Sequence, residues 1–474
     1  MKIYFVGIGG IGMSAVAGLA RACGFEVYGS DEKELYPPTS ELLKELGIEV
    51  SKPDPERILK IKPDLLVVGN AVKAEHKEVL LAQKIGIPLL SFPEFLEKFI
   101  INNKKNLVVA GTHGKTTTSA LLAFVLDFLR QDPIFLVGGL LRDYGKNFRF
   151  GEGKFCVLEG DEYPSSFFNK NPKFLHYKPY GLILTSLEFD HADVYRDLLE
   201  LKEAFSNLIK LLPQEGILVY HFDDQNLREV IEKAKPACRV LTYGRKEEAD
   251  YQLVESFGFF EKTGFLNMGK VRDKRKDLFE LKLKIPGFHN LLNALSVLAL
   301  CEALGFERKN ILYALSKFSG VKRRQEIISI NENFVIIDDF AHHPTAVEIT
   351  LSELRNLIKP DKTVLVFEPR TNSSKRKIFQ EAYIKALSLA DIICIKIPQG
   401  LENIPENERI DLNYIAYKLK KLGKEAYIFE KNCPYEKINF DFSKKTLVVF
   451  MSSASMKEEM EELLNFLNHQ RIHV

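Results

Sequence analysis

The sequence predicts an α/β protein built from three domains, of which the first and last are Rossmann-like. Short apolar runs alternate with amphipathic helical stretches along the whole chain, which is typical of parallel sheets covered by helices. A polar break, "INNKKN" at 101–106, precedes a new strand, and the same α/β alternation starts again near Val321. A chain of 474 residues is long enough for about two to four domains. We therefore expect domains at 1–103, 104–320 and 321–474.

The first domain opens with the strand-like run "KIYFVG". Two helical stretches, "SAVAGLARACG" and "SELLKELG", each end in Gly, a residue that favours helix C-termini. The remaining strand candidates are "EVYGSD", "DLLVVGNA" and "IPLLSF". This order of strands and helices predicts a small, doubly wound parallel sheet.

The second and third domains follow the same pattern. The central domain starts with a strand, "LVVAG", and a helix, "TTTSALLAFVLDFL", and has strand-rich material at 250–285 before a long helix from His289. Its other strand candidates are "FCVLEGD", "YGLILTSL", "GILVYHF" and "CRVLTYG". Those of the third domain are "NFVIIDDFA", "KTVLVFEP", "DIICIKI", "EAYIFE" and "KTLVVFM".

Composition excludes several classes of function. A formal net charge of +2 gives no electrostatic case for nucleic acid or for an anionic membrane. The most apolar helical stretch, "LLNALSVLALCEALGF", is too short and too polar for membrane insertion. Six scattered cysteines form no C-x-x-C pair, which suits a reducing compartment. We expect a cytoplasmic protein that is a monomer or a weak dimer.

The first Gly-rich turn, "VGIGGIG" at 6–12, directly follows the opening strand. Glycines at a strand-to-helix turn let a phosphate approach the backbone, so this turn is compatible with any pyrophosphate-containing ligand. NAD is one such ligand and a sugar nucleotide is another. The turn alone does not decide between them.

The second turn, "AGTHGKTTT" at 110–118, carries a stronger signal. It joins a strand to a helix, so its backbone N–H groups can hold phosphate oxygens, while Lys115 adds a positive charge and Thr116 a hydroxyl for Mg²⁺. The loop is a shortened variant, because Val109 stands where the strict pattern has Gly and the glycine is Gly111. A chance Gly-rich turn is the alternative. The coincidence of strand, G-K-T and helix favours a central domain of the P-loop ATPase type that binds ATP.

Two strand-end residues are candidate metal ligands. Glu159 in "VLEGDEY" and His191 in "LEFDHADVY" each follow an apolar run that would bring them to the phosphates. Mg²⁺ prefers oxygen ligands, so a histidine suggests a second site that tolerates Mn²⁺. On residue type alone, either could be an ordinary polar residue at a strand end.

The order and approximate spacing of these and later stretches resemble the Mur ligase family. The stretches are "AGTHGKTTT", "EGDEY", "LEFDH", "GFHNLLNA", "GVKRR" and "DDFAHHPTA". Members of that family use ATP to join an amino acid or a peptide to a UDP-muramoyl substrate through an acyl phosphate. The resemblance implies that the first domain holds the UDP of UDP-N-acetylmuramate rather than NAD.

The resemblance also implies roles for individual residues. The UDP-substrate site would include Gly7, Gly9, Gly10, Gly12, Ser30, Asp31, Asn70 and Ala71. The ATP site would include Gly111, Thr112, His113, Gly114, Lys115, Thr116, Thr117, His289, Asn290, Asn293, Arg324, Asp338 and Asp339. The metal ligands would be Thr116, Glu159 and His191, and the catalytic residues Lys115, Glu159, His191, Arg324 and His343. Arg324 could instead be a solvated charge in a basic run, His289 could cap its helix, and His342 could be a structural histidine.

Two segments indicate the branch of the family. "DDFAHHPT" resembles the branch that couples L-alanine, or in one step the tripeptide L-alanyl-γ-D-glutamyl-meso-diaminopimelate, and Phe205 stands where other branches carry a carbamylated lysine. "VFEPRTNSSK" and the extra residues between "EGDEY" and "LEFDH" resemble the tripeptide enzymes, while "MSSASMKE" at 451–458 departs from their Gly-rich loop. Arg370 and Asn372 are then candidates for binding the peptide, because Arg can hold a carboxylate with two hydrogen bonds.

Three other hypotheses stay open at this point. L-alanine could be the amine in the same reaction. A non-catalytic protein that binds ATP and a UDP-sugar would be favoured if Lys115, Glu159 or His191 were missing, but all three are present. An NAD-dependent oxidoreductase is disfavoured, because nothing after the first turn resembles a hydride-transfer site.

Overall fold

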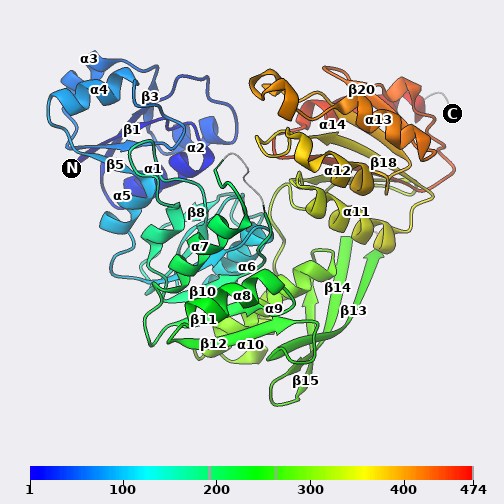
Figure 1. The fold of residues 1–474 in the computed structure, drawn as a ribbon, viewed down its shortest axis with the longest axis horizontal. Helices are drawn as coiled ribbons and strands as arrows, with labels where there is room; N and C mark the ends of the chain where they lie inside the picture. Colours follow the sequence, from blue (N-terminus) through cyan, green and yellow to red (C-terminus); the bar gives the residue numbers. More distant parts are fainter. Residues whose placement is uncertain (190–193, 262–263, 472–474) are drawn as a thin grey trace.

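A computed structural model describes residues 1–189, 194–261 and 264–471. Figure 1 shows three α/β regions, with the central one at the base and the N-terminal and C-terminal regions above it on either side. Each region is built on its own sheet, and the three sheets have five, ten and six strands in the described part of the chain. The predicted α/β fold class is confirmed. The exact boundaries at 103/104 and 320/321 stay predictions.

The N-terminal sheet is parallel throughout, with the strand order β3-β2-β1-β4-β5. Its strands are β1 (Lys2–Val6), β2 (Glu26–Ser30), β3 (Glu49–Ser51), β4 (Leu65–Val68) and β5 (Leu89–Ser91). The helices are α1 (Ile11–Ala22), α2 (Thr39–Glu45), α3 (Pro55–Ile61), α4 (Lys77–Lys84) and α5 (Phe92–Phe99). The order reverses beside β1, so the Gly-rich turn after β1 lies where such sheets bind ligands.

The central sheet has the strand order β15-β14-β13-β12-β11-β10-β6-β9-β7-β8. Its strands are β6 (Lys105–Ala110), β7 (Ile134–Leu136), β8 (Phe148–Arg149), β9 (Phe155–Gly160), β10 (Gly181–Leu184), β11 (Ile217–His221), β12 (Arg239–Gly244), β13 (Tyr251–Glu261), β14 (Gly264–Asp273) and β15 (Leu278–Leu283). The helices are α6 (Lys115–Phe128), η1 (Lys173–Tyr177), α7 (Leu198–Ile209), α8 (Gln225–Ala234), α9 (Phe288–Ala303) and α10 (Arg308–Leu315). Strand β6 lies between β10 and β9, so the ends of all three strands meet at the second Gly-rich turn.

The C-terminal sheet has the order β16-β17-β21-β18-β19-β20, and only the edge strand β16 is antiparallel to its described neighbour. Its strands are β16 (Glu326–Ile330), β17 (Phe334–Asp339), β18 (Lys362–Glu368), β19 (Ile392–Lys396), β20 (Glu425–Phe429) and β21 (Thr446–Ser452). The helices are α11 (Pro344–Ile358), η2 (Lys377–Phe379), α12 (Gln380–Leu387), η3 (Leu401–Asn403), η4 (Glu406–Glu408), α13 (Leu412–Lys421), η5 (Tyr435–Lys437) and α14 (Lys457–Arg471).

Apolar packing joins the N-terminal region to the central one. A single core cluster contains Phe5 and Phe95 from the first sheet and its helices together with Phe148 and Phe174 from the central region. Helix α1 approaches β8 so closely that a Cβ on Gly18 would lie 2.2 Å from Cζ of Phe148. The two regions therefore share one hydrophobic core.

The long β13–β14 pair projects from the central sheet toward α11 (Figure 1). Phe260 and Phe265 of this pair belong to the core cluster of the C-terminal region. On β13, a Cβ at Gly258 would lie only 1.9 Å from Cδ2 of Leu357, which is on α11. The pair is thus an apolar support for the C-terminal region.

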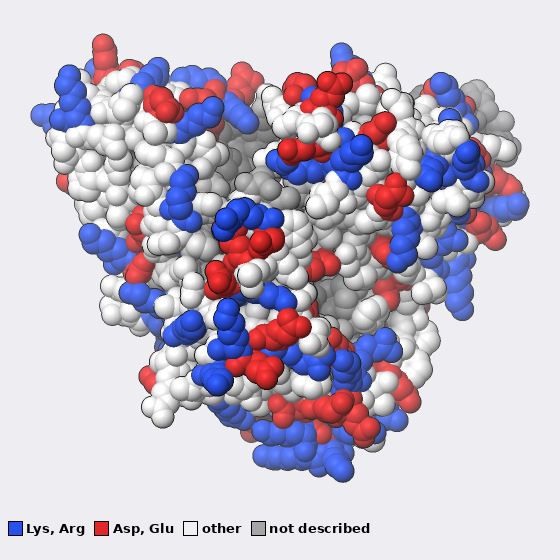
Figure 2. Space-filling view, viewed as in Figure 1, with Lys and Arg blue, Asp and Glu red and all other residues white. Residues whose placement is uncertain are grey.

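Local predictions differ from the structure mainly at element ends. The first helix begins at Ile11, so its N-terminus is formed by the Gly-rich turn itself, and helices α3, α4 and α5 were not predicted. Gly24 and Gly47, expected at helix C-termini, both have positive φ and follow the C-cap residues of α1 and α2. Within the described residues, no helix is long and apolar enough to cross a membrane. Figure 2 shows acidic and basic side chains interspersed over the visible face.

Candidate functional site

The turn after β6 has glycines at positions where a ligand could contact the backbone directly. Gly111 and Gly114 have φ of +141° and +82°, which disfavour any residue with a side chain. A Cβ at Gly111 would lie 2.2 Å from Oγ1 of Thr185, and one at Gly114 would lie 2.9 Å from Oδ1 of Asn293. Gly114 immediately precedes helix α6. The helix N-terminus and the loop N–H groups can together hold a phosphate.

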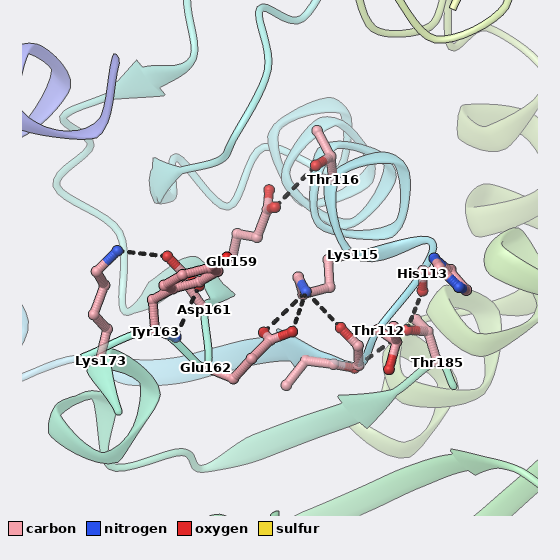
Figure 3. Close-up of polar contacts among 12 residues, drawn as sticks. Thr112, His113, Lys115, Thr116, Glu159, Asp161, Glu162, Tyr163, Lys173 and Thr185 are labelled. Carbon is pink, nitrogen blue, oxygen red and sulfur yellow. Dashed lines mark hydrogen bonds and ion pairs between the residues drawn. The ribbon is translucent and has the colours of Figure 1, made fainter. Parts of the chain in front are cut away.

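Lys115 is held at the base of this loop by an acidic neighbour that the sequence analysis did not single out. Its Nζ lies 2.6 Å from the carbonyl oxygen of Gly111 and 2.9 Å from Oε2 of Glu162 (Figure 3). Desolvation lowers the pKa of Lys115, but the charges of Glu162 and Asp161 outweigh it, so the pKa is raised and the amine stays charged. The Glu162 carboxylate therefore occupies the place where an anionic phosphate would pair with Lys115.

Asp161 is neutralised separately. Lys173 lies 2.5 Å from Oδ2 of Asp161. Burial raises the pKa of Asp161, but Lys173 and Lys115 together bring it down to about 2. Asp161 thus stays ionised and balances the charges of Lys173 and Lys115.

Thr116 and Glu159 converge on one point from α6 and β9. The Thr116 hydroxyl donates to Oε1 of Glu159 at 2.9 Å (Figure 3), and the backbone N–H of Gly138 donates to Oε2 at 2.6 Å. A hydroxyl and a carboxylate next to a phosphate loop are hard oxygen donors, the set that Mg²⁺ prefers. Thr116 and Glu159 therefore fit a magnesium ion, which would be completed by water and phosphate. His191, the third predicted ligand, lies outside the described residues.

Arg324 reaches this point from the start of the C-terminal region. Its Nη2 donates to Oγ1 of Thr116 at 3.1 Å, and its guanidinium lies over the ring of Phe340, 4.5 Å from the centroid. Burial lowers its pKa, yet a guanidinium remains charged at any physiological pH. The structure thus brings a partly buried positive charge from the C-terminal region onto the start of α6 in the central one.

Two residues predicted for the ATP site, Asn290 and Asn293, form a polar chain beside Gly114. Asn293 donates to Asn290 at 3.1 Å, and Asn290 donates to Gln325 at 3.1 Å, so the start of α9 is linked to the start of the C-terminal region. His289 lies at the first turn of α9, after the N-cap residue Gly287, and desolvation lowers its pKa to about 4. A neutral, half-buried imidazole at this point suits contact with an uncharged ring.

The two aspartates at the end of β17 are buried and constrained. Asp339 accepts the N–H groups of Gln325 and Ala341, both at 2.7 Å. Asp338 pairs with Arg323 at 3.3 Å, and burial raises its pKa to about 6. Burial also raises the pKa of Asp339. The hydrogen bond from Gln325 links Asp339 to the segment that carries Arg324, and the role of both aspartates in ATP binding stays a prediction.

His113 and His343 meet at a carboxylate rather than on the phosphate side of the loop. Nε2 of His113 contacts Oε1 of Glu188, and Nδ1 of His343 lies 3.3 Å from the same oxygen. The neighbouring His342 has its Nδ1 3.0 Å from the carbonyl oxygen of Phe340, so the adjacent histidines have separate surroundings. Glu188 lies in the "LEFDH" stretch, but the sequence analysis gave it no role.

The first Gly-rich turn is held open by its own backbone and by Asp31. Gly7 and Ile8 donate to the carbonyl oxygen of Ser30, and Gly9 donates to Oδ2 of Asp31 at 2.8 Å. Gly10 caps α1 with no side-chain hydrogen bond, and a Cβ at Gly12 would meet nothing within 4 Å. The N-terminus of α1 is therefore accessible to a diphosphate.

The other predicted UDP contacts lie around this turn. Asn70 and Ala71 are exposed in the turn after β4. The Ser30 hydroxyl is buried and donates to Glu78. Because its oxygen is already used inside the domain, Ser30 supports the turn through its backbone rather than by a side-chain contact.

The predicted peptide contacts lie in the loop after β18. Arg370 lies 3.3 Å from Glu368 and donates to Gln399 at 2.8 Å, while Asn372 is exposed. Lys375 lies close by, within 3.1 Å of the carbonyl oxygen of Gln399, and burial lowers its pKa. The loop thus presents Arg370, while Lys375 is buried beneath it and was not predicted.

Comparisons with known proteins agree with this architecture. Residues 2–104 match a profile described as "Mur ligase family, catalytic domain", residues 109–301 match "Mur ligase middle domain", and residues 323–454 match "Mur ligase, glutamate ligase domain". The UDP-N-acetylmuramate–L-alanine ligase of Carboxydothermus hydrogenoformans is 33% identical over 98% of this chain and 96% of its own length. The UDP-N-acetylmuramate–L-alanyl-γ-D-glutamyl-meso-2,6-diaminoheptandioate ligase of Escherichia coli K12 is 34% identical over 84% of this chain and 85% of its own.

A solved structure gives the same result. The crystal structure of UDP-N-acetylmuramate-alanine ligase from Thermotoga maritima superposes with a TM-score of 0.81 at 30% identity, over 99% of this chain and 100% of that one. The likeness runs through all three regions. The chain therefore belongs to the Mur ligase family of ATP-dependent amide ligases of peptidoglycan synthesis.

Proposed function

We propose that this enzyme joins UDP-N-acetylmuramate to the tripeptide L-alanyl-γ-D-glutamyl-meso-diaminopimelate, with ATP and Mg²⁺. The contact between Arg324 and Thr116 carries the proposal. It places a cation from the C-terminal region beside the lysine, hydroxyl and carboxylate of a phosphate loop. A site of this kind is suited to moving a phosphoryl group between two anions.

The reaction needs an activated carboxylate, because a carboxylate oxygen is a poor leaving group. Transfer of the γ-phosphoryl group of ATP to the muramoyl carboxylate gives an acyl phosphate and ADP. The amine then attacks the acyl carbon, loses a proton, and displaces phosphate as the amide bond forms. Lys115 and Arg324 would stabilise the charge on the transferring group, and Glu159 and Thr116 would hold the magnesium ion, which neutralises phosphate oxygens when bound.

Lys115 must exchange partners during this reaction. In the structure its charge is balanced by Glu162, which is almost fully buried. Phosphate binding would replace this carboxylate, and departure of the products would restore it. Glu162 thus prevents a buried, unpaired ammonium between turnovers, a state that would be costly.

The proposed amine component rests on two segments. The "EPRTN" loop presents Arg370, a basic group suited to a carboxylate of a peptide. The residues between Glu159 and β10 form a segment with its own hydrogen bonds. Ser165 donates to the carbonyl oxygen of Asn171. Ser166 donates its N–H to the carbonyl oxygen of Asn169, and its hydroxyl oxygen accepts the N–H of Asn169. Both segments resemble tripeptide ligases.

L-alanine is a second candidate for the amine. The relative from Carboxydothermus hydrogenoformans and the structure from Thermotoga maritima, which cover nearly the whole chain, are both named for L-alanine. The short "MSSASMKE" segment after β21 also lacks the glycines expected of tripeptide ligases. This candidate keeps the same ATP chemistry and changes only the acceptor site.

The experiment measures ATP-dependent phosphate release with UDP-N-acetylmuramate and either L-alanine or the tripeptide. Turnover with the tripeptide alone supports the proposal. Turnover with L-alanine alone replaces it with the second candidate. No turnover with either amine, in an enzyme that binds ATP, contradicts both.

A further inference from the structure

A three-residue cluster lies between the central and C-terminal regions, apart from the Thr116–Glu159 pair. It consists of His113 from the phosphate loop, Glu188 from the loop after β10, and His343 from the N-cap of α11. One ligand atom from each residue lies within 4.8 Å of the other two. Two imidazoles and a carboxylate are the ligand set of many zinc and other transition-metal sites.

The cluster is held in a fixed geometry. The imidazoles of His113 and His343 are 5.1 Å apart between centroids, and both contact Oε1 of Glu188. Thr345 donates to Oε2 of Glu188 at 3.2 Å, which orients the carboxylate. Phe379 packs edge-on against the ring of His343. Such outer contacts are what a metal site needs to orient its ligands.

The charge of the cluster also favours a cation. Burial raises the pKa of Glu188, but the hydrogen bond and charge of His113, followed by the charge of His343, outweigh it and hold the pKa low. In the described part of the chain, Glu188 pairs with these two imidazoles and with no lysine or arginine. Within the described residues, a divalent cation bound by the three side chains would therefore supply a counter-charge that no lysine or arginine gives to this carboxylate.

We propose that His113, Glu188 and His343 form a binding site for Zn²⁺ or a similar transition-metal ion that links the phosphate loop to the C-terminal region. His343 is buried, while the other two side chains are 26% and 34% exposed, so an ion can enter from one side. The nitrogen donors distinguish this site from the all-oxygen pair of Thr116 and Glu159. An ion bound here fixes the C-terminal region on the loop and hinders its release.

The inference does not rest on the identity of the amine substrate, and its test needs no turnover. The tag-free full-length chain is titrated with Zn²⁺ against a chromophoric chelator, without nucleotide, and with Co²⁺ while visible absorption is recorded. Wild type should bind one Zn²⁺ per chain and give a Co²⁺ spectrum of low coordination number. Glu188→Gln and His343→Ala should each weaken Zn²⁺ binding about tenfold or more.

Two variants serve as matched controls. His469→Ala removes an exposed imidazole on α14, and Glu159→Gln removes a carboxylate from the oxygen pair, so both should bind Zn²⁺ like wild type. Circular dichroism confirms the fold of each variant, and His113→Gln replaces either site variant that fails to fold. Unchanged Zn²⁺ affinity in Glu188→Gln and His343→Ala overturns the proposal, as does a loss confined to Glu159→Gln.

Diffraction gives an independent answer. A Zn²⁺-soaked crystal should show an anomalous peak among the three side chains. A peak only elsewhere would refute the site.

Discussion

The central region meets its two neighbours in different ways. Toward the N-terminal region the contact is a shared apolar core, in which Phe148 lies against Gly18 of α1. At the phosphate loop, the contact with the C-terminal region is polar and consists of Arg324 with Thr116 and of His343 and Thr345 with Glu188. Apolar contact with the C-terminal region lies farther away, at β13 and β14.

This difference separates stability from chemistry. Apolar burial stabilises a junction whether or not ligands are bound, because the stabilisation depends on the apolar surface area that is removed from water. Contacts between charged groups respond to protons, phosphates and metal ions, and their net stabilisation is small. The first junction should therefore behave as a permanent one, whereas the polar junction should change with ligands.

The largest expected effect is on the polar junction. Arg324→Ala removes the cation that reaches the loop from the C-terminal region, so we expect kcat to fall about 10²–10³-fold. The midpoint of thermal unfolding should stay within a few degrees of wild type. Steady-state phosphate release and a thermal melt measure the two quantities.

Lys322→Ala is the matched control, because Lys322 is an exposed cation in the same basic run. It should keep wild-type kcat. Equal losses in both variants would show that the general charge of the run matters rather than the contact with Thr116.

A smaller effect concerns the folding stability that is lost when the carboxylate of Asp338 is ionised in its buried position. Burial raises the pKa of Asp338 to about 6, above its ordinary value near 4, so ionisation destabilises the folded chain as pH rises through this window. Asp338→Asn should therefore raise the free energy of unfolding by up to about 3 kcal/mol at pH 7. Near pH 4 the two chains should be almost equally stable. Urea unfolding at both pH values gives the difference, and a gain that is the same at both would exclude ionisation as its cause.

At the apolar junction, in contrast, we expect a substitution to lower the free energy of unfolding. Gly18→Val places methyl groups where the Phe148 ring lies, and we expect the free energy of unfolding to fall by about 1–3 kcal/mol. Adding Phe148→Ala makes room, so the double variant should be more stable than the sum of the single effects predicts. Strictly additive losses would argue that the two side chains do not meet.

The smallest effect concerns a polar contact that accompanies the apolar junction. Asn169 donates to Oε1 of Glu94 on α5 at 3.0 Å. Asn169→Ala should lower the free energy of unfolding by about 1 kcal/mol and leave kcat unchanged. Lys170→Ala, at an exposed neighbouring position, should have no measurable effect on either. A large fall in kcat for Asn169→Ala would show that this junction also takes part in catalysis.

Local sequence patterns were sufficient for the fold class and for the loops. Alternating strands and helices, and glycines beside G-K-T, act within a few residues, so the phosphate loop and both Gly-rich turns could be located without a structure. The convergence of Thr116 with Glu159 also followed, since β9 and the loop after β6 end at the same edge of the sheet.

Long-range partners could not be predicted in this way. Strand β9 ends at Gly160, so no alternation rule tells which of the following carboxylates faces Lys115, and the structure selects Glu162. Glu188 acquires its surroundings only when the C-terminal region brings His343 to it. Likewise, nothing local shows that the extra residues after Glu159 reach α5, where His176 pairs with Glu97.

The β13–β14 pair has a mechanical consequence. It is hydrogen-bonded through β12, β11 and β10 to β6, the strand that leads into the phosphate loop, and at its other side it supports α11 (Figure 1). The support of the C-terminal region is therefore part of the same hydrogen-bonded sheet as the strand that leads into the phosphate loop. If the C-terminal region rotates about this support, Arg324 and His343 would move relative to the loop while the sheet stays in place.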